Sequence, residues 1–224
     1  MGGLDARYLI SPAGLNRAQW FASLTTISTP HHGSPLADVI TGSATLGLSD
    51  LLCLVELPEE TLAAIVESLS KSAPALVPLS VFAPQAILDT LKDAEGYCAR
   101  LLGTPPDAFR ELTTAFTSGF NTRYPSLEGV PLLCYAGNSS PDRTMCRALF
   151  ASWAYMRCKT GDNDGVVPYS SSIWGGSVRA VPADDFEEVG WGSLFDGPLP
   201  REHFPIGGLY EDIDLWQRGL PASP

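Results

Sequence analysis

Hydrophobic spacing changes along the chain, and the changes predict different elements. Leu4, Tyr8 and Leu9 recur at helical spacing, which predicts a helix over residues 1–10. Residues 21–27 form instead a short apolar run with β-branched members, typical of a buried central strand. Residues 130–136 form a second such strand, which Gly137 closes. Helical and strand patterns therefore both occur in this chain.

The stretch 36–114 has helical patterns throughout. One helix runs from Pro58 to Leu69, and its first turn pairs a proline with two glutamates, which suit the positive end of the helix dipole. A second helix carries the apolar residues of 87–91. A third begins at 104–107 and places three apolar residues on one face: Phe109, Leu112 and Phe116. The region is either an ordinary helical layer over a sheet or a cap over a site.

Composition narrows the class of protein. The chain has 224 residues, of which 45% are hydrophobic and 17% charged, so we expect one packed domain. The formal charge of −11 and the absence of basic runs argue against a nucleic-acid partner. Apolar stretches are far shorter than the ~20 residues of a transmembrane helix, so no transmembrane segment is expected.

Neither the cysteines nor the histidines indicate a metal site. The five cysteines are scattered and contain no C-x-x-C pair, so we expect reduced, mostly buried thiols rather than a zinc site or a disulfide framework. His31 and His32 are adjacent, and adjacent side chains diverge on a helix or a strand. No metal or other cofactor is predicted.

Two residues late in the chain are candidates for chemistry. Asp164 lies in the turn-rich segment Thr160-Gly-Asp-Asn-Asp-Gly-Val-Val-Pro168, which lacks the alternating acids and distal glutamate of a calcium loop. His203 lies in a loop before a helix-like segment at 209–218 and is the only histidine beyond Asp164. An imidazole can move a hydroxyl proton while a carboxylate fixes its tautomer.

Four motifs resemble the triacylglycerol lipases of the Pseudomonas and Burkholderia type and their fungal relatives. The opening segment is similar to the part of the lipase elbow that follows the serine of G-H-S-x-G-G. The segment 26–34 is similar to the strand and T-P-H-x-G-S loop of these enzymes. Residues 112–125 are similar to L-T-T followed by F-N-x-x-[FY]-P, and residues 163–167 match N-D-G-x-V.

The resemblance implies an α/β-hydrolase fold, of which 1–224 would be a single, C-terminal part with a helical cap or lid at about 36–114. Asp164 matches the triad acid, which follows a late strand in this family, and His203 matches the base. The nucleophile serine would precede Met1, whose nitrogen would then belong to the oxyanion hole. No intact G-x-S-x-G occurs in the chain, and Pro141 takes the place of the last glycine in Gly137-Asn-Ser-Ser-Pro141.

By this resemblance the whole enzyme would hydrolyse carboxylic esters of lipids, with acylglycerols as substrates and a cap that contacts the lipid surface. The chain as given, without its serine, would be inactive. The sequence departs from the bacterial pattern after His203 and at Ser170, so neither their calcium nor their disulfide is expected. Two other interpretations stay open: a non-catalytic fragment or pseudo-hydrolase serving as an interaction module, and a lipid acyltransferase.

Overall fold

A computed structural model of the chain describes residues 1–44, 53, 106–125, 129–140, 145–146, 149–191 and 203–219. Most of the 36–114 stretch lies outside the described residues. The helices expected at 58–69 and around 87–91 fall in that part, so the cap stays a prediction.

Three parallel strands form the described sheet. They are β1 (Leu24–Ile27), β2 (Leu132–Gly137) and β3 (Ser177–Val181), in the order β1-β2-β3. β2 lies between the other two, and its side chains are buried from Leu133 onward. A parallel strand covered on both faces needs apolar residues at successive positions, which explains the continuous run in β2. Parallel strands with intervening helices confirm the α/β class.

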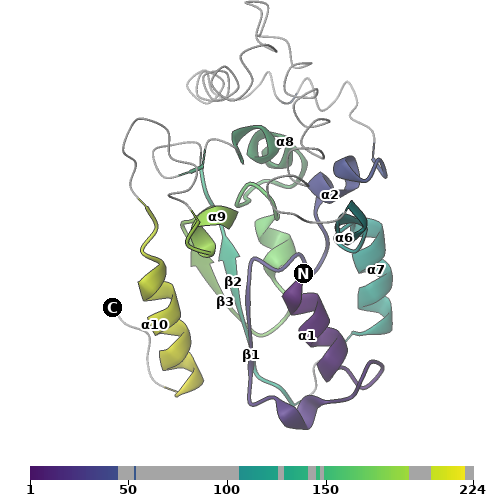
Figure 1. Cartoon of the computed structure of the whole chain (residues 1–224), viewed down its shortest axis with the longest axis vertical. Helices are drawn as coiled ribbons and strands as arrows, with labels where there is room; N and C mark the ends of the chain where they lie inside the picture. Colours follow the sequence, from purple (N-terminus) through teal and green to yellow (C-terminus); the bar gives the residue numbers. More distant parts are fainter. Residues whose placement is uncertain are drawn as a thin grey trace, which may run out of the picture.

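Helices connect the strands and cover them (Figure 1). They are α1 (Gly2–Ile10), α2 (Pro35–Ile40), α6 (Pro106–Arg110), α7 (Thr114–Arg123), α8 (Phe150–Thr160), α9 (Asp185–Glu188) and α10 (Ile206–Gln217), with 3₁₀ turns η1 (Ala18–Trp20) and η4 (Tyr169–Ser172). The predicted helix at 1–10 is confirmed, and the two predicted strands are confirmed with later starts. None of the described helices has the length and apolar character needed to span a membrane.

The helix expected from 104 onward is two helices. α6 ends at Arg110 and α7 begins at Thr114. Thr113 caps α7, because its Oγ1 accepts a hydrogen bond from the backbone N–H of Phe116 at 3.2 Å. A threonine hydroxyl favours such a cap over a continuing helix. The prediction that Phe109 and Phe116 share one helix face was therefore wrong.

The sequence pattern did not indicate β3. Its residues are mostly exposed, and Val178 keeps 37% of its surface in contact with solvent. The strand is fixed by its pairing with β2, in which Cys134 lies beside Val178 and Gly137 beside Val181. Pairing of this kind depends on residues far away in sequence, so it leaves little trace in a local pattern.

The two faces of the sheet are covered by different helices. α10 packs Leu209 against a cluster that contains Leu133, Tyr135 and Val181. The neighbouring positions of the strands point to the opposite face, where Thr26 Oγ1 lies 3.4 Å from the Nε2 of His31. Figure 1 shows α1 and α10 on opposite sides of the strands.

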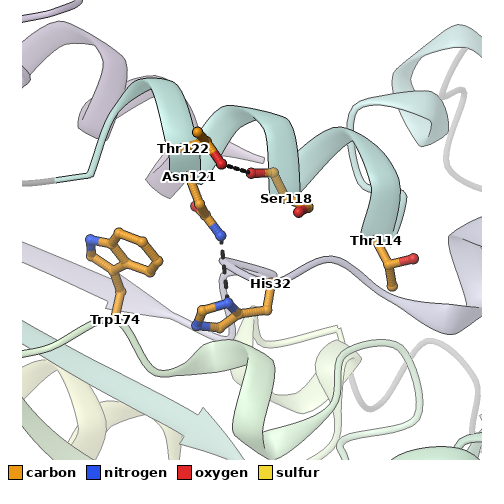
Figure 2. A pocket seen from close by; sticks show the side chains of 6 residues that line it. All are labelled: His32, Thr114, Ser118, Asn121, Thr122 and Trp174. Carbon is orange, nitrogen blue, oxygen red and sulfur yellow. Dashed lines mark hydrogen bonds between the residues drawn. The ribbon is translucent and has the colours of Figure 1, made fainter.

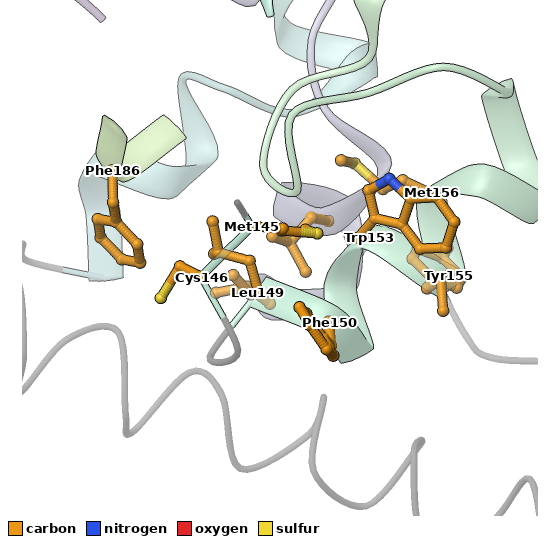
Figure 3. Packing of buried hydrophobic residues seen from close by; sticks show 11 residues of the cluster. Met145, Cys146, Leu149, Phe150, Trp153, Tyr155, Met156 and Phe186 are labelled. Carbon is orange, nitrogen blue, oxygen red and sulfur yellow. The ribbon is translucent and has the colours of Figure 1, made fainter. Parts of the chain in front are cut away.

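A second apolar cluster anchors α8 (Figure 3). It joins α2 and α8 to the residues around Met145 and to α9. Its largest buried members are Leu36, Ile40, Met145, Leu149, Phe150, Trp153, Tyr155, Met156 and Phe186. Because both ends of α8 take part, the turn that follows this helix has a fixed position.

A disulfide joins Cys53 to Cys158 near the end of α8. The expectation of reduced thiols was wrong for this pair. The two cysteines are 105 positions apart, so no local spacing signals the bond. Cys134 and Cys146 are buried thiols outside any disulfide, as predicted. Cys98 lies outside the described residues.

Candidate active site

Asp164 lies in a tight turn between α8 and η4. The turn is closed by an isolated antiparallel bridge between Asn163 and Pro168. Asn163 Oδ1 accepts a hydrogen bond from the N–H of Gly165 at 2.9 Å. Gly165 has a φ of 98°, a conformation that glycine adopts without strain. The expectation that the acid directly follows a strand was wrong, because this turn follows the helix α8.

Two backbone N–H groups hold one oxygen of the Asp164 carboxylate. The residue is fully buried, and its Oδ1 accepts hydrogen bonds from the N–H groups of Val166 at 2.8 Å and Val167 at 2.7 Å. Within the part of the chain that the structure describes, its buried Oδ2 has no hydrogen-bond partner. A buried acceptor without a partner costs free energy, so Oδ2 marks a position suited to a hydrogen-bond donor.

Gly137, the last residue of β2, lets two carboxyl groups approach the same point. A Cβ atom at Gly137 would lie 2.1 Å from Oε1 of Glu188 and 2.8 Å from Cβ of Asp164. Ser28 Oγ donates to that Oε1 at 2.8 Å and accepts from the N–H of Gly137 at 3.0 Å. Ser28 has a φ of 38°, which is unusual for a residue with a side chain. Asp164, Glu188 and Ser28 therefore gather at the carboxyl end of β2.

The two buried carboxyl groups disfavour each other's charge. Burial, and then the charge of Asp164, raises the pKa of Glu188 to about 10. Burial, and then the charge of Asp185, raises the pKa of Asp164 to about 8, while the N–H groups of Val167 and Val166 oppose the shift. Asp164 thus has donors that favour its ionised form, and we infer that Glu188 holds the proton at neutral pH.

The free energy of unfolding is expected to fall less at high pH in Glu188→Gln than in the wild type. The folded-state pKa of Glu188 is raised, so between its ordinary pKa and about 10 the folded protein binds more protons than the unfolded chain. Stability therefore falls as pH rises through that window. Glutamine keeps the acceptor for Ser28 and cannot ionise. At pH 9 the variant should exceed wild type in free energy of unfolding by more than about 1.4 kcal/mol, the worth of one pKa unit.

Urea unfolding at pH 5, 7 and 9 measures this difference. At pH 5 the gap should be smallest, because Glu188 is protonated in the folded state and pH 5 lies only just above its ordinary pKa of 4.5. Glu211→Gln, on the exposed part of α10, is the matched control and should follow wild type at every pH. An equal gap at all three pH values would show that the effect is one of packing and not of proton binding.

α9 faces the start of α1. Asp184 caps α9, and its Oδ1 accepts from the N–H groups of Phe186 and Glu187. Burial lowers the pKa of the Met1 amino group, whereas the charges of Asp5 and Asp185 raise it. The beginning of α1 therefore lies within electrostatic reach of α9. Figure 1 shows the N-terminus and α9 at the same end of the strands.

His203 lies in the segment that enters α10, and its side chain is exposed. The next residue is held by α9, because the N–H of Phe204 donates to Oε1 of Glu187 at 3.3 Å. Glu187 is 3% exposed, and its Oε2 accepts from the N–H of Asp184. His203 does not occupy the free Oδ2 of Asp164 in this structure. The pairing of Asp164 with His203 stays a prediction.

His31 is neutral and structural in its contacts. Burial, and then the charge of Arg7, lowers the pKa of His31 to about 3. Arg7 is fully buried and lies 3.3 Å from Nδ1 of His31, while its guanidinium donates to the carbonyl of Tyr124 at 3.1 Å. The same guanidinium stacks on the ring of Trp174 at 3.5 Å from its centroid. These contacts tie α1 to the turn that follows β1.

Sequence reasoning missed the residues that surround Asp164. Glu188 and Ser28 are 160 positions apart, so no local motif joins them. α9 could have been found, because Asp184 and Glu187 have the spacing of a capping box.

A curated protein that is similar to this chain in sequence is a triacylglycerol lipase, the class that the sequence motifs indicate. The chain is 31% identical over 196 residues to triacylglycerol lipase 2 of Saccharomyces cerevisiae, an alignment that covers 85% of this chain and 44% of the yeast protein. The chain is lipase-like in sequence. It spans less than half the length of this curated relative, and no protein-family model matches it.

Two solved structures are similar to the chain. Bacillus licheniformis lipase BlEst2 in its mature form has a TM-score of 0.49 and 22% identity, and the match covers 83% of this chain and 55% of that one. EstA from Clostridium botulinum has a TM-score of 0.45 and 16% identity, with 89% and 63% covered. Both TM-scores are below 0.5 and both identities are below 25%.

Proposed function

We propose that this chain supplies the acid and the base of a Ser-Asp-His esterase that acts on lipid esters, with acylglycerols as substrates. One observation carries the proposal. Asp164 is fully buried at the carboxyl end of β2; two N–H groups fix its Oδ1, and no described residue forms a hydrogen bond with its Oδ2. A carboxylate that orients a triad histidine needs one oxygen held by the protein and the other directed at the imidazole.

His203 is the proposed base. Its Nδ1–H would donate to Oδ2 of Asp164, and its Nε2 would take the proton of the serine hydroxyl and return it to the leaving alcohol. Burial raises the pKa of Asp164 to about 8, and an imidazole donor at Oδ2 would favour its charged form. The hydrogen bond between Glu187 and Phe204 supports this role, because it fixes the chain next to His203.

The serine of the proposed enzyme lies outside this chain. No G-x-S-x-G occurs in the 224 residues, and the yeast lipase is more than twice as long as the matched part. In the whole protein the Met1 backbone nitrogen would donate to the oxyanion. The charge of Asp185 acts on the Met1 amino group, and this interaction between α9 and the start of α1 supports the proposed arrangement.

The proposed fold of the whole enzyme is an α/β-hydrolase, of which this chain is a C-terminal part. The parallel order β1-β2-β3 with helices on both faces supports it. The region 36–114 would form the cap and contact the lipid surface.

A non-catalytic role is the second candidate function. It is favoured by the missing serine motif and by the exposed position of His203. The chain would then be a pseudo-hydrolase or an interaction module. A lipid acyltransferase would use the same triad and differ in its acceptor, so product analysis separates it: transfer gives a new ester, and hydrolysis gives free fatty acid.

We expect residues 1–224 to show no significant hydrolysis of short or long p-nitrophenyl esters, because a triad without its nucleophile keeps only residual rate enhancement. A longer protein that adds G-H-S directly before Met1, with the preceding strands, should hydrolyse them and release fatty acid from triacylglycerol. Inactivity of a folded longer protein would favour the non-catalytic role. Hydrolysis by the short chain that is lost in Ser139→Ala would place the nucleophile inside it.

A further inference from the structure

A pocket of about 410 Å³ lies between α7 and the turn that follows β1 (Figure 2). Neither Asp164 nor His203 lines it. Its walls come from three separate parts of the chain: α7, the turn at His32 and the segment after η4. The lining residues are His32, Thr114, Ser118, Asn121, Thr122 and Trp174.

α7 contributes a polar face to this pocket. Thr114, Ser118, Asn121 and Thr122 follow the spacing i, i+4, i+7 and i+8, which places them on one side of the helix. That spacing in a helix usually carries the apolar stripe, whereas here it carries hydroxyl and amide groups. Thr114 Oγ1 donates to Asp38, and Thr122 Oγ1 donates to the carbonyl of Ser118, so both hydroxyl oxygens can still accept.

Buried and partly buried contacts fix the walls of the pocket. Asn121 Nδ2 donates to the carbonyl of His31 at 2.8 Å. The N–H of His32 donates to Ser171 Oγ at 3.1 Å, and Ser171 Oγ donates to the carbonyl of Gly33. Trp174 is braced by the guanidinium of Arg7, which stacks on its ring. A pocket with fixed walls loses little conformational freedom when a ligand binds.

The chemistry of the lining selects the ligand. None of the six lining side chains is a carboxylate, a lysine or an arginine. The pocket offers hydroxyl groups, an amide, an imidazole and an indole ring, and its volume lies in the range of small-molecule sites. Hydroxyl-rich ligands with a C–H face can hydrogen-bond to such groups and pack on an aromatic ring.

We propose that this pocket binds a neutral, polyhydroxylated ligand of monosaccharide size. The C–H face of the ligand packs on Trp174, and its hydroxyl groups bond to the polar face of α7 and to His32. The same chemistry has two sources, a free sugar or polyol and the glycosyl headgroup of a lipid. The site is independent of the proposed ester hydrolysis, because it uses none of its residues.

The test measures binding of methyl glucoside to the 224-residue chain by chemical-shift titration. We expect saturable binding with a Kd on the order of 1–10 mM, a weak affinity typical of a small open site. Ser118→Trp fills the pocket from an exposed position and should weaken binding at least tenfold. Ala115→Trp adds the same side chain at an exposed position of α7 outside the lining and should leave the Kd unchanged.

Further arms identify the source and the charge of the ligand. Co-sedimentation with phosphatidylcholine vesicles, with and without a galactosyl diacylglycerol, assigns a lipid headgroup if only the glycolipid vesicles bind wild type and Ser118→Trp does not. Binding of free sugar alone assigns a soluble ligand. The proposal is overturned if no probe binds saturably, if Ser118→Trp binds like wild type, or if glucuronate binds tighter than methyl glucoside.

Discussion

Asp164→Asn, made in the longer protein that contains the serine, is expected to lower kcat by about 10⁴-fold, the loss typical when the orienting carboxylate of a serine triad becomes an amide. The asparagine side chain can keep the two backbone hydrogen bonds at Oδ1, so the turn should survive. Its amide nitrogen then occupies the Oδ2 position and donates where the imidazole must donate. The histidine is thereby held in the wrong tautomer. Steady-state kinetics on a p-nitrophenyl ester measure the loss.

Asp162→Asn is the matched control for this variant. Asp162 is in the same turn, is exposed, and pairs with Arg157 on the surface. Its loss should change kcat less than about twofold, because exposed ion pairs contribute little. His203→Ala should lose at least as much activity as Asp164→Asn, because it removes the base itself. If Asp162→Asn is inactive and Asp164→Asn is active, the triad acid is Asp162 and not Asp164.

Reduction of the Cys53–Cys158 disulfide is expected to lower the free energy of unfolding by about 2–4 kcal/mol, the usual contribution of a native disulfide. The two cysteines are 105 positions apart, so the bond closes a long loop and restricts the unfolded chain strongly. Guanidinium unfolding of the 224-residue chain, with and without dithiothreitol, measures the difference.

Two cysteine variants separate this bond from the other thiols. Cys158→Ser should unfold at the midpoint of the reduced wild type and show no further response to dithiothreitol. Cys146→Ala removes a buried thiol that takes no part in a disulfide, so the variant should keep the full response to dithiothreitol, whatever its own packing cost. Detection of free thiol at both Cys53 and Cys158 in the unreduced protein would contradict the pairing.

Features that depend on local motifs were predicted from the sequence more often than features that depend on long-range pairing. The helix at 1–10, the two strands and the turn around Asp164 follow from a few adjacent residues, because glycine and asparagine impose a turn by their own geometry. The break at Thr113 was missed, although a threonine cap is also a local signal. Apolar spacing on both sides of the break outweighed it.

The surroundings of Asp164 could not be predicted in this way. Ser28 and Glu188 meet across 160 positions, and Gly137 matters only because both carboxyl groups approach it. β3 likewise exists through its pairing with β2. Contacts of this kind depend on how the whole sheet folds. They join residues that are distant in sequence, so no local spacing of residues predicts them.

The way in which α1 is attached determines how its position responds to salt concentration. Arg7 is held by the rings of Trp174 and Phe120 and by neutral acceptors, all inside the protein. Dissolved ions screen the interactions between exposed charges, with a Debye length of about 8 Å at physiological ionic strength. Interactions between buried groups are screened far less. The attraction within surface ion pairs such as Arg157 with Asp162 will weaken as the salt concentration rises. The buried contacts of Arg7 that hold α1 in place will not weaken. We therefore expect the packing of α1 against β1 and the turn after it to be insensitive to salt concentration.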